Sequence, residues 1–447
     1  MYGLKKAAVI MCAMLALAGC SRELDPSADA VEEELNPPGT SVFVSPSGSD
    51  ENTGKDAKAP LKSIQMAVRK AVEYGYRDIC LEKASFTPGK GLNDDLTNGL
   101  LLTNSDLNLI GGWISAFTRK DGKSTLDGNK SLFHIIKAVS VTNVIMSNLK
   151  IMGGKASNSS LESDPLDHGG GIFLKNTCYC KLENSVIMSN TAGYSGGGLF
   201  LIYSHSNTID ATIRDNNSER GAGLLIKQSS GNTVIGDFTQ NSSLLHGGAI
   251  ELYYATNNSI EADIYNNTAQ YSGPGIFIWN SSYNTVSGKI FENLAYDNFH
   301  DSDDFDQGGG GIYFYNSRGN RILAVVSNNQ TTNSMGGGIY LKLSDSNTIE
   351  GPVVGNESQN MAGGIMVYDS SYNQFKGDIR NNQSENYGGG IYIYQDTGVT
   401  ISNIFTGTIS LNTTGTGGGG IYQYQTGTND WTQADIRDNQ PDNVGVN

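Results

Sequence analysis

A repeat of about 26 residues, glycine clusters at fixed positions in it and strand-like alternation between them predict an all-β fold. We expect a right-handed parallel β-helix solenoid of about 26 residues per coil, with an N-terminal capping module that contains one short helix. Segments between turns alternate apolar and polar residues over four to six positions, which is the period of a strand.

The glycine clusters set the register of the repeat. An Ile or Leu follows each cluster at ten places: Ile172, Leu199, Leu224, Ile250, Ile276, Ile312, Ile339, Ile365, Ile391 and Ile421. Most steps are 25 to 27 residues, and the two longest follow insertions at 294–307 and about 395–400. The glycines should lie at corners where the backbone needs positive φ or where neighbouring coils leave no room for a Cβ.

Asparagines recur in the same register. One series follows an apolar residue by three positions, from Ile187 and Asn190 to Ile436 and Asn439. The other lies eight residues past the glycine-cluster residue: Asn207, Asn232, Asn258, Asn284, Asn320, Asn347 and Asn373. An asparagine amide at a corner can bond the coils on both sides, so we expect this series to be a buried structural ladder.

Equivalent strands of successive repeats run in the same chain direction, so neighbouring strands must be parallel. One repeat then makes one coil of three short strands, and coils stack about 4.8 Å apart. Parallel crossovers are right-handed, which gives the expected hand.

The first residues are a targeting signal. Lys5 and Lys6 precede the apolar run 7–17, and small residues lead to Cys20. This resembles a bacterial lipoprotein signal, which implies removal of 1–19, lipidation of Cys20 and a place in the cell envelope, at the outer membrane or cell surface. The acidic, proline-containing segment 20–40 should form an extended tether.

Residues 41–113 should form the N-terminal cap and first coils, and 114–447 the repeats. Apolar residues at helical spacing follow Pro60, which we place at a helix start: Leu61, Ile64, Ala67, Val68, Ala71 and Val72. The helix can cover the open end of the first coil, which would otherwise expose core and strand edges.

Two further resemblances cover nearly all of 41–447. GGAI at 247–250 with FTQN at 238–241, and their variants, resemble the repeat pair of chlamydial-type polymorphic outer-membrane proteins. The segments 42–54, 59–68 and 109–113 resemble the amino-terminal module of bacterial β-helix surface proteins in the pectate-lyase-like superfamily. These resemblances imply a surface protein and, for the repeat family, an adhesin.

The charge limits the partners. The formal net charge is −15 and becomes −17 without residues 1–19. Each phosphate of a nucleic acid needs a Lys or Arg opposite it, so we expect no nucleic acid, and membrane attachment through the lipid alone.

The strand after each glycine cluster should present two outward columns. The first column is Phe173, Phe200, Leu225, Glu251, Phe277, Tyr313, Tyr340, Met366, Tyr392 and Tyr422. The second column is Lys175, Ile202, Lys227, Tyr253, Trp279, Tyr315, Lys342, Tyr368, Tyr394 and Tyr424. We expect an exposed aromatic stripe that binds a ligand through Phe277, Trp279, Tyr313, Tyr315, Tyr340, Tyr368, Tyr392, Tyr394, Tyr422 and Tyr424. The alternatives are glycan binding, a protein partner or self-association, and aromatic stacking alone.

Catalytic groups are harder to place. We find no paired carboxylates on neighbouring coils and therefore propose no catalytic residue. A polysaccharide lyase or hydrolase and a passive surface protein are the two alternatives to a binding protein. No cofactor is expected, except that an acidic insertion could hold calcium through Asp301, Asp303, Asp304 and Asp306.

Overall fold

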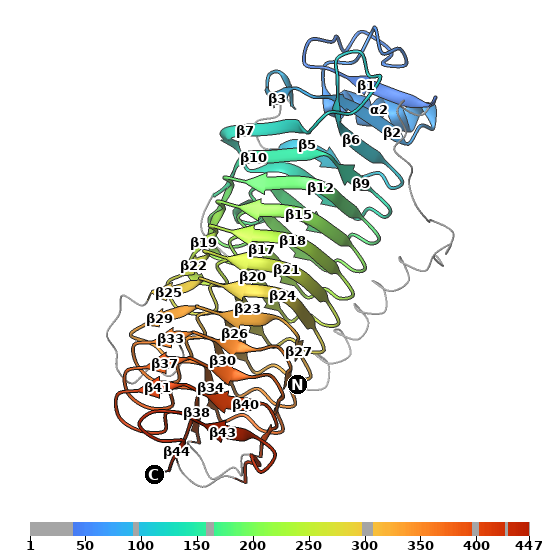
Figure 1. Cartoon of the computed structure of the whole chain (residues 1–447). Helices are drawn as coiled ribbons and strands as arrows, with labels where there is room; N and C mark the ends of the chain where they lie inside the picture. Colours follow the sequence, from blue (N-terminus) through green and yellow to red (C-terminus); the bar gives the residue numbers. More distant parts are fainter. Residues whose placement is uncertain are drawn as a thin grey trace, which may run out of the picture.

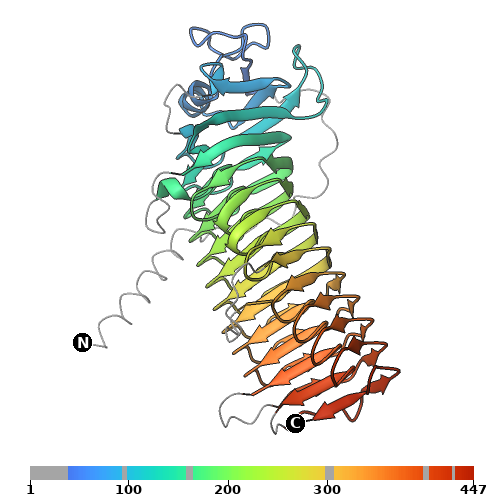
Figure 2. The ribbon, with the colours of Figure 1, turned by 90° about the vertical axis from the view of Figure 1, so that its left-hand side faces the viewer.

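The computed structural model describes residues 39–92, 98–157, 165–296, 307–395, 402–424 and 428–446. These residues form one long stack of coils, with the cap at one end and the last coil at the other (Figures 1 and 2). Cys20 and the calcium candidates Asp301, Asp303, Asp304 and Asp306 lie outside the described residues.

The stack has three faces. The aromatic face is a sheet of thirteen parallel strands that carries both predicted columns. Its strands are β5 (Asn98–Leu102), β8 (His134–Val139), β11 (Ile172–Lys175), β14 (Leu199–Ile202), β17 (Leu224–Lys227), β20 (Ile250–Tyr253), β23 (Ile276–Trp279), β26 (Ile312–Tyr315), β30 (Ile339–Lys342), β34 (Ile365–Tyr368), β38 (Ile391–Tyr394), β42 (Ile421–Tyr424) and β44 (Val444–Val446).

The long face follows the corner after each aromatic-face strand. Its strands bend in the middle and divide in two in the later coils. They are β1 (Ser41–Val44), β2 (Asp78–Glu82), β6 (Asn108–Trp113), β9 (Ile145–Ser147), β12 (Lys181–Met188), β15 (Thr208–Arg214), β18 (Thr233–Thr239), β21 (Ser259–Tyr265), β24 (Thr285–Phe291), β27 (Arg321–Ile322), β28 (Val325–Ser327), β31 (Thr348–Ile349), β32 (Val353–Val354), β35 (Gln374–Phe375), β36 (Ile379–Arg380), β39 (Ile404–Phe405), β40 (Thr408–Ser410) and β43 (Asp435–Arg437).

The short face leads back to the glycine corner. Its strands are β13 (Thr191–Ala192), β16 (Asn217–Arg220), β19 (Ser242–His246), β22 (Thr268–Ala269), β25 (Leu294–Tyr296), β29 (Gln330–Thr332), β33 (Glu357–Ser358), β37 (Gln383–Ser384) and β41 (Thr413–Thr414). In the first coils, β10 (Leu149–Ala156) runs from the long face, where it pairs with β12, onto the short face, where it pairs with β13. β7 (Ser124–Leu132) pairs with β10, β3 (Ser85–Pro88) with β7 and β4 (Gly91–Leu92) with β3, and a 3-10 turn spans Pro165–Asp167.

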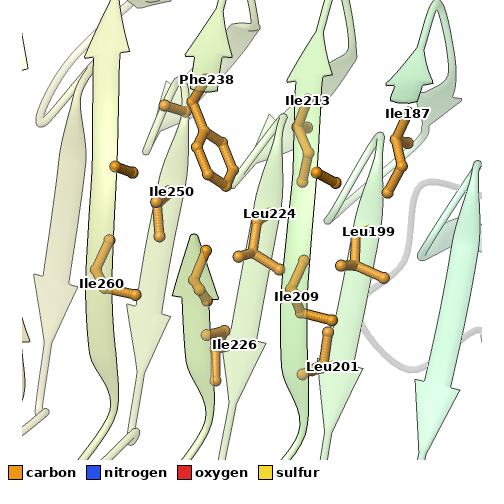
Figure 3. Packing of buried hydrophobic residues seen from close by; sticks show 14 of the residues in the cluster. Ile187, Leu199, Leu201, Ile209, Ile213, Leu224, Ile226, Phe238, Ile250 and Ile260 are labelled. Atoms are coloured by element: carbon orange, nitrogen blue, oxygen red, sulfur yellow. The ribbon is translucent and has the colours of Figure 1, made fainter. Parts of the chain in front are cut away.

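The predicted parallel coil is confirmed. Ile172 pairs with Leu199, Leu199 with Leu224, and the same register continues to the pairing of Ile391 with Ile421. Every residue that follows a glycine cluster lies in the solenoid interior. Figure 3 shows Leu199, Leu224 and Ile250 of the aromatic face packed beside Ile209 and Ile260 of the long face.

Two asparagine ladders run along the corners of the long face. The Asn207 series is buried, and from Asn232 onward each Oδ1 accepts hydrogen bonds from the backbone N–H and Nδ2 of the preceding coil's asparagine, for example 2.9 and 3.0 Å from Asn258 to Asn284. The residues joined in this way are 25 to 27 apart, and 36 and 30 apart across the two insertions. The second series, from Asn190 to Asn439, is bonded in the same pattern.

The glycine clusters are required by close approach, as predicted. A Cβ built on Gly390 would lie 2.5 Å from the carbonyl oxygen of Gly420 in the next coil. The first glycine of a cluster has positive φ, such as 69° at Gly388. Both conditions favour glycine at these corners, although Ala249 takes the place of Gly390 and Ala362 takes the place of Gly388 with a φ of 60°.

One short helix covers the first coil. Helix α2 (Ile64–Tyr74) begins after Ser63, whose Oγ accepts a hydrogen bond from the Met66 N–H, and ends at Gly75 in the left-handed conformation. Its buried residues Ile64, Ala67, Val68 and Ala71 join the core.

Three details of the predicted helix differ. Pro60 and Leu61 precede the helix, because Leu61 forms a β-bridge with Val44. Val72 faces solvent and is 47% exposed. Among the described residues, no helix has the length and the apolar character needed to cross a membrane.

Candidate functional site

The second column forms a continuous row along the aromatic face, in which every side chain except the exposed Lys175 is half-buried. Register pairing places one member on each coil, from Lys175 in β11 to Tyr424 in β42. Neighbouring ring centroids are 5.8 Å apart for Tyr253 and Trp279, and 5.1 Å apart for Trp279 and Tyr315. The row therefore offers solvent aromatic and lysine side chains, with Ile202 as its one aliphatic member.

The prediction that the first column is exposed is wrong. Its side chains point away from the solenoid interior, but none is more than 8% exposed, so Phe277, Tyr313, Tyr340, Tyr392 and Tyr422 cannot be reached by a ligand in this arrangement. They form a separate apolar cluster outside the core, with Met335, Ala362 and Met366 as its other buried members.

The cover over the first column is the chain that enters each glycine corner. At Gly388, a Cβ would lie 2.7 Å from the Cβ of Tyr392, so the backbone lies directly on that side chain. The ring of Tyr387, just before this glycine, is 4.5 Å from the ring of Tyr422 in the next coil. Burial also raises the pKa of the Tyr392 phenol, which agrees with its loss of contact with water.

The C-terminal part of the second column is a stacked ladder. The rings of Tyr368 and Tyr394, and of Tyr394 and Tyr424, are 5.1 Å apart with interplanar angles of 16° and 8°. Each ring covers a face of its neighbour, so the ladder presents ring edges and hydroxyl groups outward. Lys342 continues the row, with its Nζ 5.2 Å from the Tyr368 ring centroid.

A buried ion pair lies under the N-terminal part of the row. Arg220 Nη2 donates to Glu251 Oε1 at 2.5 Å, and the side chains are 10% and 0% exposed. The Arg220 guanidinium carbon is 4.9 Å from the Tyr253 ring centroid and 5.2 Å from that of Trp279, within cation–π range. The sequence reading placed Glu251 in a column but missed this pair, because Arg220 belongs to a different part of the repeat.

Histidines pack on the first column beside this pair. His168 stacks on Phe200 at 4.7 Å, and His246 stacks on Phe277 at 4.6 Å. Burial, with the nearby Arg220 charge, lowers the pKa of His246 to about 3. His246 is therefore neutral at ordinary pH.

Paired carboxylates do occur on neighbouring coils, which corrects the sequence reading. Asp237 of β18 and Asp263 of β21 are in register on the long face, away from both columns, and Lys289 of β24 follows them. Asp237 is exposed to solvent. Within the described part of the chain, no three His, Cys, Asp or Glu residues are placed to hold a metal ion.

Sequence reasoning also missed the tyrosines at the corner beside the second column. Tyr203, Tyr254, Tyr283 and Tyr372 have positive φ and are 41% to 67% exposed. Tyr254 contacts Tyr253 edge-to-face at 4.8 Å, so the corner extends the aromatic surface sideways. Tyrosine at positive φ is rare and would have marked these positions, but φ cannot be read from the sequence.

The chain shares its fold with known right-handed β-helix proteins. Residues 170–354 and 230–440 match the family described as "Right handed beta helix region", which agrees with the predicted hand. No curated protein sequence matches the chain significantly. Among solved structures, the chain is similar to the one described as "Crystal structure of pectate lyase Pel9A", with a TM-score of 0.38 and 14% identity, over 89% of this chain and 78% of that one. No activity is assigned from a similarity this low.

Proposed function

Because this chain belongs to the right-handed β-helix family, whose stacked coils build a long flat face, we propose that it binds an extended polysaccharide along its aromatic face. The contacts would be made by the second column, in particular Tyr253, Trp279, Tyr315, Tyr394 and Tyr424. The single observation that carries the proposal is that half-buried aromatic side chains occupy this row coil by coil from Tyr253 to Tyr424, interrupted only at Lys342.

The chemistry of the row suits sugars. A sugar ring has an apolar face edged by hydroxyl groups, and a tyrosine or tryptophan has an apolar ring with one polar group. A repeating ligand would meet a repeating surface, since neighbouring second-column rings lie 5.1 to 5.8 Å apart. The buried first-column aromatics pack beside the second-column rings on the same side of the sheet.

The same proposal includes a place in the bacterial envelope. Lipidation of Cys20 would anchor the chain at the outer membrane or cell surface, and the 20–40 tether would hold the solenoid away from the lipid. Adhesion through the aromatic face is the role that follows. Growth with labelled fatty acid tests the anchor: label should enter the wild-type protein but not Cys20→Ser.

Retention on immobilised polysaccharides tests the binding. The purified chain is passed over β-glucan, mannan, xylan, chitin and polygalacturonate, with and without calcium, and each polysaccharide is sized before and after. We expect retention without shortening, and its loss when Trp279, Tyr315 and Tyr394 are replaced by serine. Tyr265→Ser is the matched control, because Tyr265 stacks with Phe291 at 5.0 Å on the long face.

The other outcomes separate the alternatives. Shortening of a polysaccharide would put a lyase or hydrolase first. Retention that survives the serine substitutions would move the site away from the second column. No retention on any polysaccharide would refute glycan binding and leave a protein partner, self-association or a passive surface role.

A further inference from the structure

The second column is not uniform, and its N-terminal part has a different ring geometry from the tyrosine ladder. The Tyr253 and Trp279 rings are inclined by 59°, and the Trp279 and Tyr315 rings by 54°. Inclined rings cannot cover each other's faces as parallel rings do. Trp279, at the centre of this group, is half-buried, whereas the Phe277 ring beside it on the same strand is 2% exposed.

Arg220 lies against two of the inclined rings. Its guanidinium carbon is 4.9 Å from the Tyr253 ring centroid and 5.2 Å from that of Trp279, within cation–π range. Lys227 adds a second cation 5.1 Å from the Tyr253 centroid. The Tyr394 and Tyr424 rings, by contrast, stack at 8°.

Glu251 fixes Arg220 in this place. Glu251 occupies a first-column position between Leu225 and Phe277, both apolar, so a carboxylate there needs a compensating charge. It accepts a hydrogen bond from Arg220 Nη2, and Arg220 as a whole is 8% exposed. The pair is therefore too enclosed to act on a ligand directly, and its effect must pass through the rings that cover it.

We propose that Trp279, flanked by Tyr253 and Tyr315, is the subsite that stacks a sugar ring, and that Arg220 and Glu251 are positioning residues that hold these rings inclined. This inference rests on the proposed function. The sugar unit would be a pyranose with one unbroken apolar face, because only such a face can lie flat against the Trp279 ring.

The test is equilibrium binding to whichever polysaccharide of the panel retains the wild-type chain most strongly. The double variant Arg220→Met/Glu251→Leu removes both charges together and keeps the volume apolar, a change that folded proteins tolerate well. We expect it to unfold at nearly the wild-type temperature but to bind roughly tenfold more weakly, the size of a cation–π contact plus lost preorganisation. Arg220→Lys, which keeps a cation without the planar guanidinium, should fall between the two. Trp279→Ser should abolish binding.

The outcomes are distinguishable. A folded double variant that binds like wild type, while Trp279→Ser does not bind, would show that the ion pair is structural only and overturn the positioning role. Binding that survives Trp279→Ser but fails in Tyr394→Ser/Tyr424→Ser would place the subsite in the ladder and overturn the inference, with the proposed function intact. Should the double variant not fold, Glu251→Gln and Arg220→Lys carry the same test. A wild-type chain that binds no polysaccharide refutes the proposed function and the inference with it.

Discussion

Replacing one asparagine inside a ladder should cost far more stability than its size suggests. Asn284 is fully buried, and its side chain takes part in four hydrogen bonds. Nδ2 donates to the Ala255 carbonyl at 3.1 Å and to Asn320 Oδ1 at 3.0 Å, and Oδ1 accepts from the N–H and Nδ2 of Asn258 at 2.9 and 3.0 Å. Asn284→Ala removes all four and leaves the buried Asn258 N–H without an acceptor.

At about 1 kcal/mol for each net hydrogen bond, the loss is roughly 4 kcal/mol in the free energy of unfolding. Urea denaturation followed by circular dichroism measures it, and hydrogen exchange at the Asn258 amide should become faster in the variant. Asn386→Ala is the matched control. Asn386 is exposed and makes one side-chain bond to Asn360, so about 0.5 kcal/mol or less is expected. A loss at Asn284 no larger than that at Asn386 would refute the view that the ladder holds the coils together.

Three further predictions concern burial. Burial lowers the pKa of His246 to about 3, below its ordinary 6.5, so its contribution to stability is full above pH 6.5 and falls as the pH drops toward 3. The slope is about 1.4 kcal/mol per pH unit, and His246→Gln should flatten the measured pH dependence by that amount. Tyr392→Ser should destabilise by about 3 kcal/mol or more and Tyr394→Ser by less than half as much, since the first side chain is buried and the second is half-exposed; equal losses in thermal unfolding would contradict the assigned burial. Cys180 donates its backbone N–H to Asn207 Oδ1 at 3.0 Å where the ladder ends, so Cys180→Asn should extend the ladder and raise stability by about 1 kcal/mol; a lower urea midpoint would show that the site has no room for the amide.

The repeat made the fold predictable. Steps of 25 to 27 residues that resume after each insertion permit parallel neighbours in register, and the structure pairs Ile312 with Ile339 and Ile339 with Ile365 as the steps require. A buried asparagine at a fixed place in each repeat can satisfy its side-chain amide by hydrogen bonding to the equivalent asparagines in the coils on either side. The spacing of apolar residues predicted the cap helix. It did not predict the first residue of the helix, because Leu61 forms a β-bridge with Val44 and so precedes the helix.

The exposed surface was less predictable. Alternation along Ile391–Tyr394 tells which side of the sheet a residue faces, and the structure agrees on this. It does not tell what lies above that side. The chain before Gly388 crosses over Tyr392, and this crossing depends on how a corner turns in three dimensions.

The sequence by itself determined the architecture of this protein. The same strands, glycine corners and asparagine corners recur at a short interval, and similar coils of this kind can only stack on one another. Only the tertiary structure decided which of the two outward columns meets solvent, because burial there depends on backbone from another part of the coil. It also decided the pairing of Arg220 with Glu251, which are 31 residues apart, since the two residues belong to no common motif and meet only when neighbouring coils are stacked.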